Sequence, residues 1–175
     1  MGTNCRDILM SNAFSTCLLL SGAVISQAAC VKPPPQVQVF RMGERAQAGP
    51  LIYNVFEADW RPQLGEGPMA RRPAHRFLIV HLSVTNSGAE VLSAPGLRLL
   101  DDDGHLYSET IDAQNVPSWL GLVRKLKPAD TLEGNILFDV DPKSYKLKLD
   151  DDSDPDRKVL VEMPLRFGLE NPSLP

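Results

Sequence analysis

Cysteine is scarce in the sequence: the 175 residues contain three, and none of them follows Cys30. A secreted scaffold that is held by disulfide bonds carries cysteines throughout its folded part. We therefore expect the folded part of this chain to be stabilised by a hydrophobic core. A surplus of basic charge is missing too, because the net charge is −4 at pH 7. This balance argues against a dedicated nucleic-acid binder, whose contact surface is basic.

Motifs for catalysis are also missing. The sequence has no Gly-x-Ser-x-Gly elbow and no glycine-rich phosphate loop, and no cysteine after Cys30 is left for thiol chemistry. His75 and His81 share a strand face but would lie about 20 Å apart at the rise of a strand, so one metal ion cannot bind both. We predict that the chain is not an enzyme, and we identify no cofactor, no metal site of this kind and no small-molecule substrate.

Proline, by contrast, is frequent: 15 of 175 residues, or about 9% against about 5% in average proteins. Proline disrupts helix interiors and is common in turns and at strand ends, so a helical bundle is disfavoured. Apolar residues make up 43% of the chain and charged residues 23%, which fits one globular domain. We place this domain at residues 36–165 and expect a loose tail over residues 166–175.

An uncharged, mostly apolar run covers residues 13–25, and Ser26-Gln27-Ala28-Ala29 connects it to Cys30. This layout is typical of a secretory signal peptide, and the run is shorter than the roughly 20 apolar residues that span a membrane. Cleavage after Ala28 would release a soluble protein, whereas cleavage directly before Cys30 would leave the cysteine at the new N-terminus. An uncleaved anchor, and a start at Met10 instead of Met1, stay open.

Ala28-Ala29-Cys30 resembles the lipobox of bacterial lipoproteins, in which the cysteine thiol receives a diacylglycerol. The prolines that follow form a stiff spacer, suited to holding a domain off a membrane. We predict a lipoprotein signal peptide over residues 1–29, lipidation at Cys30, and an anchored spacer over residues 30–35. Val31 after the cysteine resembles an outer-membrane sorting signal. This implies a lipoprotein of the bacterial cell envelope that faces the periplasm or the exterior, with a soluble periplasmic or secreted protein as the alternative.

Alternation of polar and apolar residues predicts about seven to eight short strands separated by turns. They cover residues 36–42, 51–60, 75–86, 97–100, 106–107, 132–140, 145–149 and 158–163. The stretch 43–50 is expected to be a turn, and 61–73, with its three prolines and two glycines, a long loop. One short helix is expected near 117–125, with Pro117 in its first turn.

The segment 75–86 is the most regular strand of the sequence. It is apolar on one face and half-apolar on the other, which is typical of a strand in the middle of a sheet. Strand 132–140 alternates as well, with Gly134, Ile136, Phe138 and Val140 on one face. The predicted core consists of Leu78, Val80, Leu82, Val84, Ile136, Phe138 and Val140.

Several elements occur in an order that resembles a known domain. Gly43-Glu44 precedes a strand, Phe77-Leu78-Ile79-Val80 leads to Thr85-Asn86, Asp103-Gly104 precedes Tyr107, and Leu126-Lys127-Pro128 precedes Gly134-Asn135-Ile136-Leu137-Phe138-Asp139-Val140. Over roughly Gln36 to Met163 the chain resembles the telokin-like domain of unknown function found in bacterial lipoproteins and secreted antigens. The resemblance implies an all-β fold, an immunoglobulin-like antiparallel β-sandwich, in an exported and non-enzymatic module of unknown ligand.

Aspartates are crowded into two turns, residues 101–103 and 150–156. Crowded carboxylates can bind Ca²⁺ through several oxygens, although neither run has EF-hand spacing. The weak calcium candidates are Asp101, Asp103, Asp150, Asp152 and Asp154. A calcium-binding or metal-dependent extracellular domain, including a metal-dependent hydrolase, is therefore the alternative function. The simpler interpretation is that acidic turns keep a sandwich soluble and discourage pairing of strand edges.

The half-apolar second face of strand 75–86 is the candidate binding surface. The loop 61–73 belongs to it because it is longer than a hairpin needs. The predicted partner-binding residues are Trp60, Phe77, Ile79 and His81. We predict a non-catalytic envelope lipoprotein, anchored to the membrane through Cys30, whose sandwich binds or assembles with another envelope protein. The alternative is that the chain's own Trp119-Leu120 segment covers this face.

Overall fold

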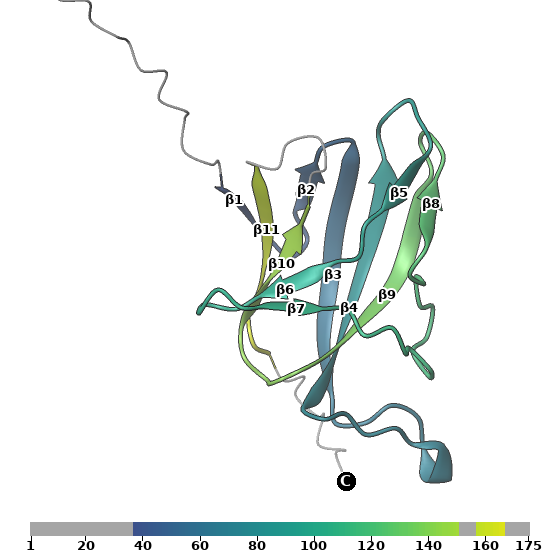
Figure 1. The fold of residues 1–175 in the computed structure, drawn as a ribbon, viewed down its shortest axis with the longest axis vertical. Helices are drawn as coiled ribbons and strands as arrows, with labels where there is room; N and C mark the ends of the chain where they lie inside the picture. The colour runs from purple at the N-terminus through teal and green to yellow at the C-terminus, as the bar shows by residue number, and fades with distance from the viewer. Residues whose placement is uncertain (1–36, 151–156, 167–175) are drawn as a thin grey trace, which may run out of the picture. The chain divides into compact units, whose positions relative to one another are not determined.

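The computed structural model describes residues 37–150 and 157–166, which form a β-sandwich (Figure 1). Its strands are β1 (Val37–Arg41), β2 (Arg45–Ala48), β3 (Leu51–Arg61), β4 (Arg76–Asn86), β5 (Leu92–Ala94), β6 (Arg98–Leu100), β7 (Leu106–Ser108), β8 (Arg124–Leu126), β9 (Thr131–Val140), β10 (Tyr145–Leu149) and β11 (Lys158–Met163). The helical element in this part of the chain is a single 3-10 turn, η1 (Gly67–Met69).

Sheet A has the strand order β1-β11-β10-β6-β7, sheet B has the order β2-β3-β4-β9, and β5 and β8 form a separate ribbon. Neighbouring strands are antiparallel except for β1 and β11, which run parallel. After β1 in sheet A the chain passes through Gly43 (φ 86°) to β2 in sheet B. The prediction of an all-β sandwich is confirmed, with this one departure from antiparallel pairing.

The core lies between the two sheets, and period-2 alternation decides which side chains enter it. All seven predicted core residues are buried there, from Leu78 on β4 to Val140 on β9. Sheet A contributes Leu147 and Leu149 from β10, and Val159 and Val161 from β11. Each such side chain contributes roughly 1.5–3 kcal/mol when it leaves water.

The described residues hold eleven strands, more than the seven or eight expected. The stretch 43–50, expected to be a turn, contains β2, whose outward Arg and Gln alternate with Ala46 and Ala48 at 0% and 1% exposure. Alanine has little strand preference, so the glycines and the proline around β2 dominate the local signal. The other unexpected strands, β5 and β8, have three residues each, too few for a periodic pattern.

The helix expected near 117–125 is wrong. Ser118 and Gly121 have φ values of 46° and 72°, which no α-helix contains. The segment instead lies along the edge of β9, where the N–H of Leu120 donates to Asn135 O (3.0 Å) and the N–H of Asn135 donates to Ser118 O (2.9 Å). The sheet edge thus takes backbone groups that a helix would pair internally.

Several predictions lie outside the described residues. These are the signal peptide, Cys30 and the spacer, the calcium candidates Asp152 and Asp154, and residues 167–175 of the tail. Within the described part of the chain, no helix has the length and apolar character needed to cross a bilayer.

Candidate functional site

Two of the four predicted partner-binding residues are buried. Trp60 points into the sandwich core, where its ring lies 6.3 Å from that of Tyr145. Phe77 points to the outer face of sheet B, yet it is fully buried and Ile79 is half-buried beside it. The cluster around Phe77 contains Leu64, Ala113, Val116 and Leu137. Trp60 and Phe77 therefore cannot contact a partner, because the core encloses the first and two loops cover the second.

The connection between β3 and β4 is the first of these loops. Leu64 and Arg71 pair in an antiparallel bridge, and Leu64 is 4% exposed. The guanidinium of Arg71 lies 4.9 Å above the ring of Phe77, and its Nη1 donates to the carbonyl oxygen of Asp112 at 2.5 Å. The long loop predicted for recognition is thus attached to the sheet through Leu64 and Arg71, whereas most of its other residues, including the tip around Met69, are exposed.

The second loop connects β7 to β8 and is closed at its base by a buried ion pair. The side chains of Glu109 and Arg124 are 4% and 1% exposed. Nη1 and Nη2 of Arg124 donate to the two carboxylate oxygens of Glu109, and Nε donates to Gly121 O at 2.8 Å. Glu109 also accepts from the N–H of Leu97. We call residues 109–124 the clamped loop, because this pair joins its two ends.

The clamped loop covers Phe77 and then follows the edge of β9. Leu120 packs on the core above Gly134, where an added Cβ would lie 2.3 Å from Ser118 O, so only glycine allows this approach. Ala113 and Val116 cover Phe77, whereas Trp119 and Leu120 lie at the strand edge. The chain therefore covers its own second face at one end of the sheet, as the alternative prediction had it. The covering residues are Ala113 and Val116, not Trp119 and Leu120.

The other end of the outer face of sheet B is open. A β-bulge between Val55 and Glu57 shifts the pairing of β3 with β4, so Phe56 adds to Glu57 on the outer face. Phe56 is 48% exposed, and its ring centroid lies 5.4 Å from that of His81. Of the four predicted residues, His81 alone lies in this open region.

His81 is held by two neighbours on β9. Its Nδ1 lies 3.1 Å from Oδ1 of Asn135, and its Nε2 lies 3.3 Å from Oε1 of Glu133. Nδ2 of Asn135 donates to Pro117 O at 2.7 Å, which fixes the amide so that Nδ1 of His81 is the donor. Trp119 lies directly opposite Asn135 and is 37% exposed.

We call these surface groups the open patch; its members are Phe56, Glu57, His81, Glu133 and Trp119. Four of the five were missed by the sequence prediction. The available signal was the broken alternation on β3, where the outward pair Phe56-Glu57 lies between the inward Val55 and Ala58. A regular strand has no two successive residues on one face.

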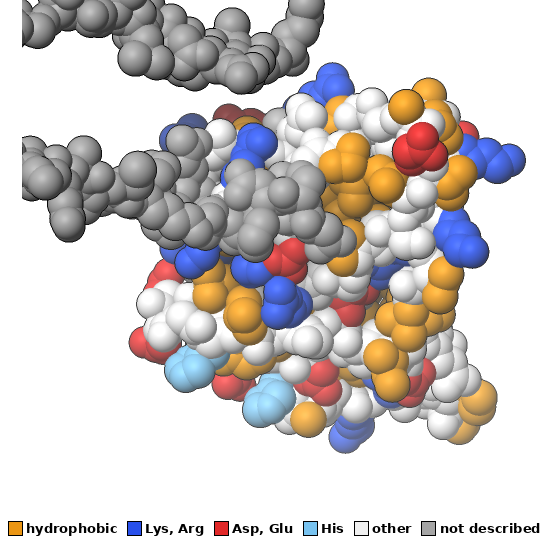
Figure 2. All heavy atoms as spheres, turned by 45° about the horizontal axis from the view of Figure 1, so that its top comes forward, with side chains coloured by type: hydrophobic (Ala, Val, Ile, Leu, Met, Phe, Trp, Pro, Cys, Tyr) orange, Lys and Arg blue, Asp and Glu red, His pale blue; other side chains and the backbone are white. Residues whose placement is uncertain are grey.

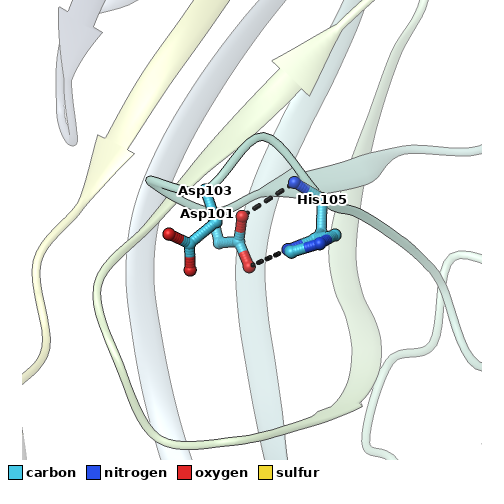
Figure 3. Close-up of side chains that lie close together, drawn as sticks. All are labelled: Asp101, Asp103 and His105. Atoms are coloured by element: carbon cyan, nitrogen blue, oxygen red, sulfur yellow. Dashed lines mark hydrogen bonds and ion pairs between the residues drawn. The ribbon is translucent and has the colours of Figure 1, made fainter.

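The first acidic turn brings two calcium candidates together. Donor atoms of Asp101, Asp103 and His105 lie within 4.8 Å of one another (Figure 3). Oδ2 of Asp101, however, already accepts from Nζ of Lys143 at 2.7 Å and from the hydroxyl of Tyr107 at 3.0 Å, and Oδ1 accepts from the N–H of His105. A metal ion would have to displace Lys143 from the buried carboxylate.

The ion pair between Asp101 and Lys143 shifts the pKa values of both groups. Lys143 beside it holds the pKa of Asp101 well below its usual range, and Asp101 in turn raises the pKa of Lys143. The ammonium also lies 5.6 Å and 5.5 Å from the ring centroids of Tyr107 and Tyr145, and burial raises the pKa of Tyr145 to about 12. This arrangement joins the β6–β7 hairpin to the β9–β10 turn and favours the charged forms of the pair.

The second acidic turn is described only at Asp150. Its carboxylate pairs with Arg98, at 2.8 Å from Nη2, and with Lys148. Figure 2 shows the same mixture of charges over one face of the molecule, where Lys and Arg alternate with Asp and Glu and hydrophobic side chains occur in separate groups. Both described turns thus use carboxylates in pairs with basic side chains.

A family model matches residues 40–157, and it describes a domain of unknown function, DUF4352. The chain belongs to the DUF4352 family. No curated protein matches it. The prediction of a domain of unknown function is therefore confirmed, whereas its assignment as telokin-like stays a prediction.

Solved structures share the fold of this DUF4352 chain. The yjhA protein of Bacillus subtilis is 18% identical with a TM-score of 0.53, over 71% of this chain and 98% of that one. MPT63, a secreted protein of Mycobacterium tuberculosis, is 13% identical with a TM-score of 0.52, over 73% and 98%. The ycdA protein of B. subtilis, described as a candidate lipoprotein, is 16% identical with a TM-score of 0.52, over 69% and 38%. At these identities the likeness shows the fold alone.

Proposed function

We propose that this DUF4352 chain is a non-catalytic binding or assembly module of the bacterial envelope. The observation that carries the proposal is the open patch, where Phe56 and Trp119 are exposed to solvent although the Phe77 end of the same face is covered by loops. Exposed aromatic side chains of this kind are typical of binding surfaces. A secreted protein and a candidate lipoprotein with the same fold support a place in the envelope.

We extend the proposal to the anchor. A lipid on Cys30 would hold the chain at the outer membrane, and β1 begins seven residues later, at Val37. Seven residues span at most about 25 Å, so the sandwich would stay close to the bilayer surface. We further propose that the sandwich is immunoglobulin-like, as the resemblance to the telokin-like domain implies.

Metabolic labelling with palmitate tests the anchor. We expect the wild type to incorporate the label and Cys30→Ser to lose it, because the thioether forms only at the lipidated cysteine. Cys17→Ser, changed within the apolar run, is the matched control and should keep the label. Equal labelling of wild type and Cys30→Ser, or no label in either, would contradict lipidation at Cys30.

Thermal unfolding of the full chain separates the binding module from the calcium-dependent alternative. A ligand that binds only the native state raises the midpoint. Because Lys143 already neutralises Asp101, we expect the same midpoint with EDTA and with Ca²⁺. A rise of several degrees with Ca²⁺ would favour a calcium-binding domain.

Crosslinking in intact cells, followed by mass spectrometry, tests the binding function itself. We expect a reproducible envelope partner of the wild-type chain, and its absence in repeated experiments would contradict the proposal.

A further inference from the structure

The open patch has a defined geometry. Glu57 pairs with His81, His81 pairs with Asn135, and Asn135 lies opposite Trp119, so four neighbouring chain segments contribute to one row. Neighbouring strands lie about 4.8 Å apart, and the row is therefore about 15 Å long. This length corresponds to four or five residues of an extended chain, at roughly 3.3–3.6 Å per residue. The row fits a short peptide segment better than a small ion.

The carboxylates of the open patch differ from three carboxylates of the described chain that pair with basic side chains. Asp101, Glu109 and Asp150 pair with Lys143, Arg124 and Arg98, respectively. Glu133, whose side chain is 61% exposed, lies 3.3 Å from Nε2 of His81, and no ion pair to a Lys or Arg is found for Glu57 or Glu133 within the described residues. The two carboxylates of the patch are thus exposed and form no ion pair with a Lys or Arg of the described residues.

The aromatic rings of the open patch, like its carboxylates, favour a cationic ligand. The faces of Phe and Trp rings attract ammonium and guanidinium groups, and carboxylates form charge-assisted hydrogen bonds with them. The bulge at Phe56 brings a ring and the carboxylate of Glu57 onto one face side by side. A cationic side chain over this surface can therefore contact a ring and a carboxylate together.

We propose that the open patch binds an extended segment of another envelope protein that carries Lys or Arg side chains. This inference rests on the proposed function, because it names the surface and the chemistry of the partner. Phe56 and Trp119 stack on the cationic side chains, and Glu57 and Glu133 pair with them. Charge complementarity selects the partner, and the sheet together with the clamped loop at its edge holds the four groups in place.

Binding of defined peptides to the full chain, purified in detergent, tests the proposal. The probe is a short fluorescent peptide of alternating Arg and Gly, and a peptide of alternating Glu and Gly is its control. We expect the Arg peptide to bind, with an affinity that falls as salt is added, and the Glu peptide not to bind. Equal binding of the two peptides, or no binding of the Arg peptide, would overturn the proposal.

Variants locate the binding surface. Removing one ring, as in Phe56→Ala or Trp119→Ala, should weaken binding about two- to fivefold. The double variant Glu57→Gln/Glu133→Gln should weaken it about tenfold or more, because both charge-assisted contacts are lost. Circular dichroism spectra and thermal midpoints like those of the wild type confirm that each variant is folded.

Matched controls lie on sheet A. Leu106→Ala removes a side chain that is 46% exposed, close to the 48% of Phe56, and Asp102→Asn removes a carboxylate that is 82% exposed. Both should bind the Arg peptide as the wild type does. If these controls bind the Arg peptide as weakly as the patch variants do, the peptide is attracted by the overall surface of the protein and not by the open patch, which would overturn the site. If cells still yield a crosslinked partner whose capture is unaffected by the patch variants, the inference fails while the proposed function stands.

Discussion

The two ends of the outer face of sheet B differ sharply, although one strand runs through both. Phe77 and His81 point to the same side of β4, four residues apart. Phe77 is 0% exposed under the β3–β4 connection and the clamped loop, whereas the His81 side chain is 34% exposed beside the half-exposed Phe56. Strand alternation decides which side chains share a face, but the loops that cross the face decide which of them reach solvent.

The buried ion pair at the base of the clamped loop gives the largest expected effect. Glu109→Gln leaves the guanidinium of Arg124 buried without a carboxylate, which should lower the free energy of unfolding by about 3–5 kcal/mol. Urea denaturation measures this loss. Asp112→Asn, in the same loop but 63% exposed, is the control and should cost less than about 1 kcal/mol. Similar losses of unfolding free energy in the two variants would contradict a stabilising ion pair at the base of the clamped loop.

A pair of phenylalanines compares the two ends directly. Phe77→Ala should lower the free energy of unfolding by about 3–5 kcal/mol, because it leaves a cavity among Leu64, Val116 and their neighbours. Phe56→Ala should cost less than about 1 kcal/mol, because its ring is half-exposed. The check is urea denaturation of both variants. Equal losses of stability in the two variants would contradict the difference in burial between Phe77 and Phe56.

Gly134 tests how closely the clamped loop approaches β9. In Gly134→Ala the new Cβ would meet Ser118 O at 2.3 Å, so the loop must move and about 1–3 kcal/mol of stability should be lost. Trp119, next to the displaced residue, should change its fluorescence. Gly96→Ala is the control, since its Cβ would meet nothing closer than 3.9 Å. An unchanged midpoint and spectrum in Gly134→Ala would contradict the close approach.

The Asp101–Lys143 pair gives a smaller, pH-dependent effect away from this face. Because the folded protein lowers the pKa of Asp101 from its ordinary 3.8, the contribution is present above that pH and is lost as the pH falls below it. Asp101→Asn should therefore be less stable at neutral pH and lose less stability between about pH 5 and pH 2. Thermal midpoints against pH measure this, and the exposed Asp103→Asn should follow the wild type. If Asp101→Asn still loses stability steeply as the pH falls, the loss comes from other titrating groups.

Much of the sandwich could be predicted from the sequence. The alternating β4 and β9 gave all seven core residues, and β10 and β11 have the predicted bounds, because burial on one face imposes a two-residue period. The exposed site could not be predicted in the same way. Burial of Phe77 depends on Ala113 and Val116, which are distant in sequence, and the outward position of Phe56 depends on a bulge. The segment 117–125 forms no helix because its partner is the edge of β9, another distant contact.

Hydroxyl-radical footprinting of the full chain, alone and with the Arg peptide, tests the central claim most directly, since it reports exposure side chain by side chain. The free chain should be oxidised at Phe56 and Trp119 and protected at Phe77 and Trp60. Addition of the peptide should protect Phe56 and Trp119 and leave Leu106 on sheet A unchanged. Equal oxidation of Phe56 and Phe77 in the free chain, or peptide protection at Leu106 instead of Phe56, would contradict a face that is covered at one end and open to a basic partner at the other.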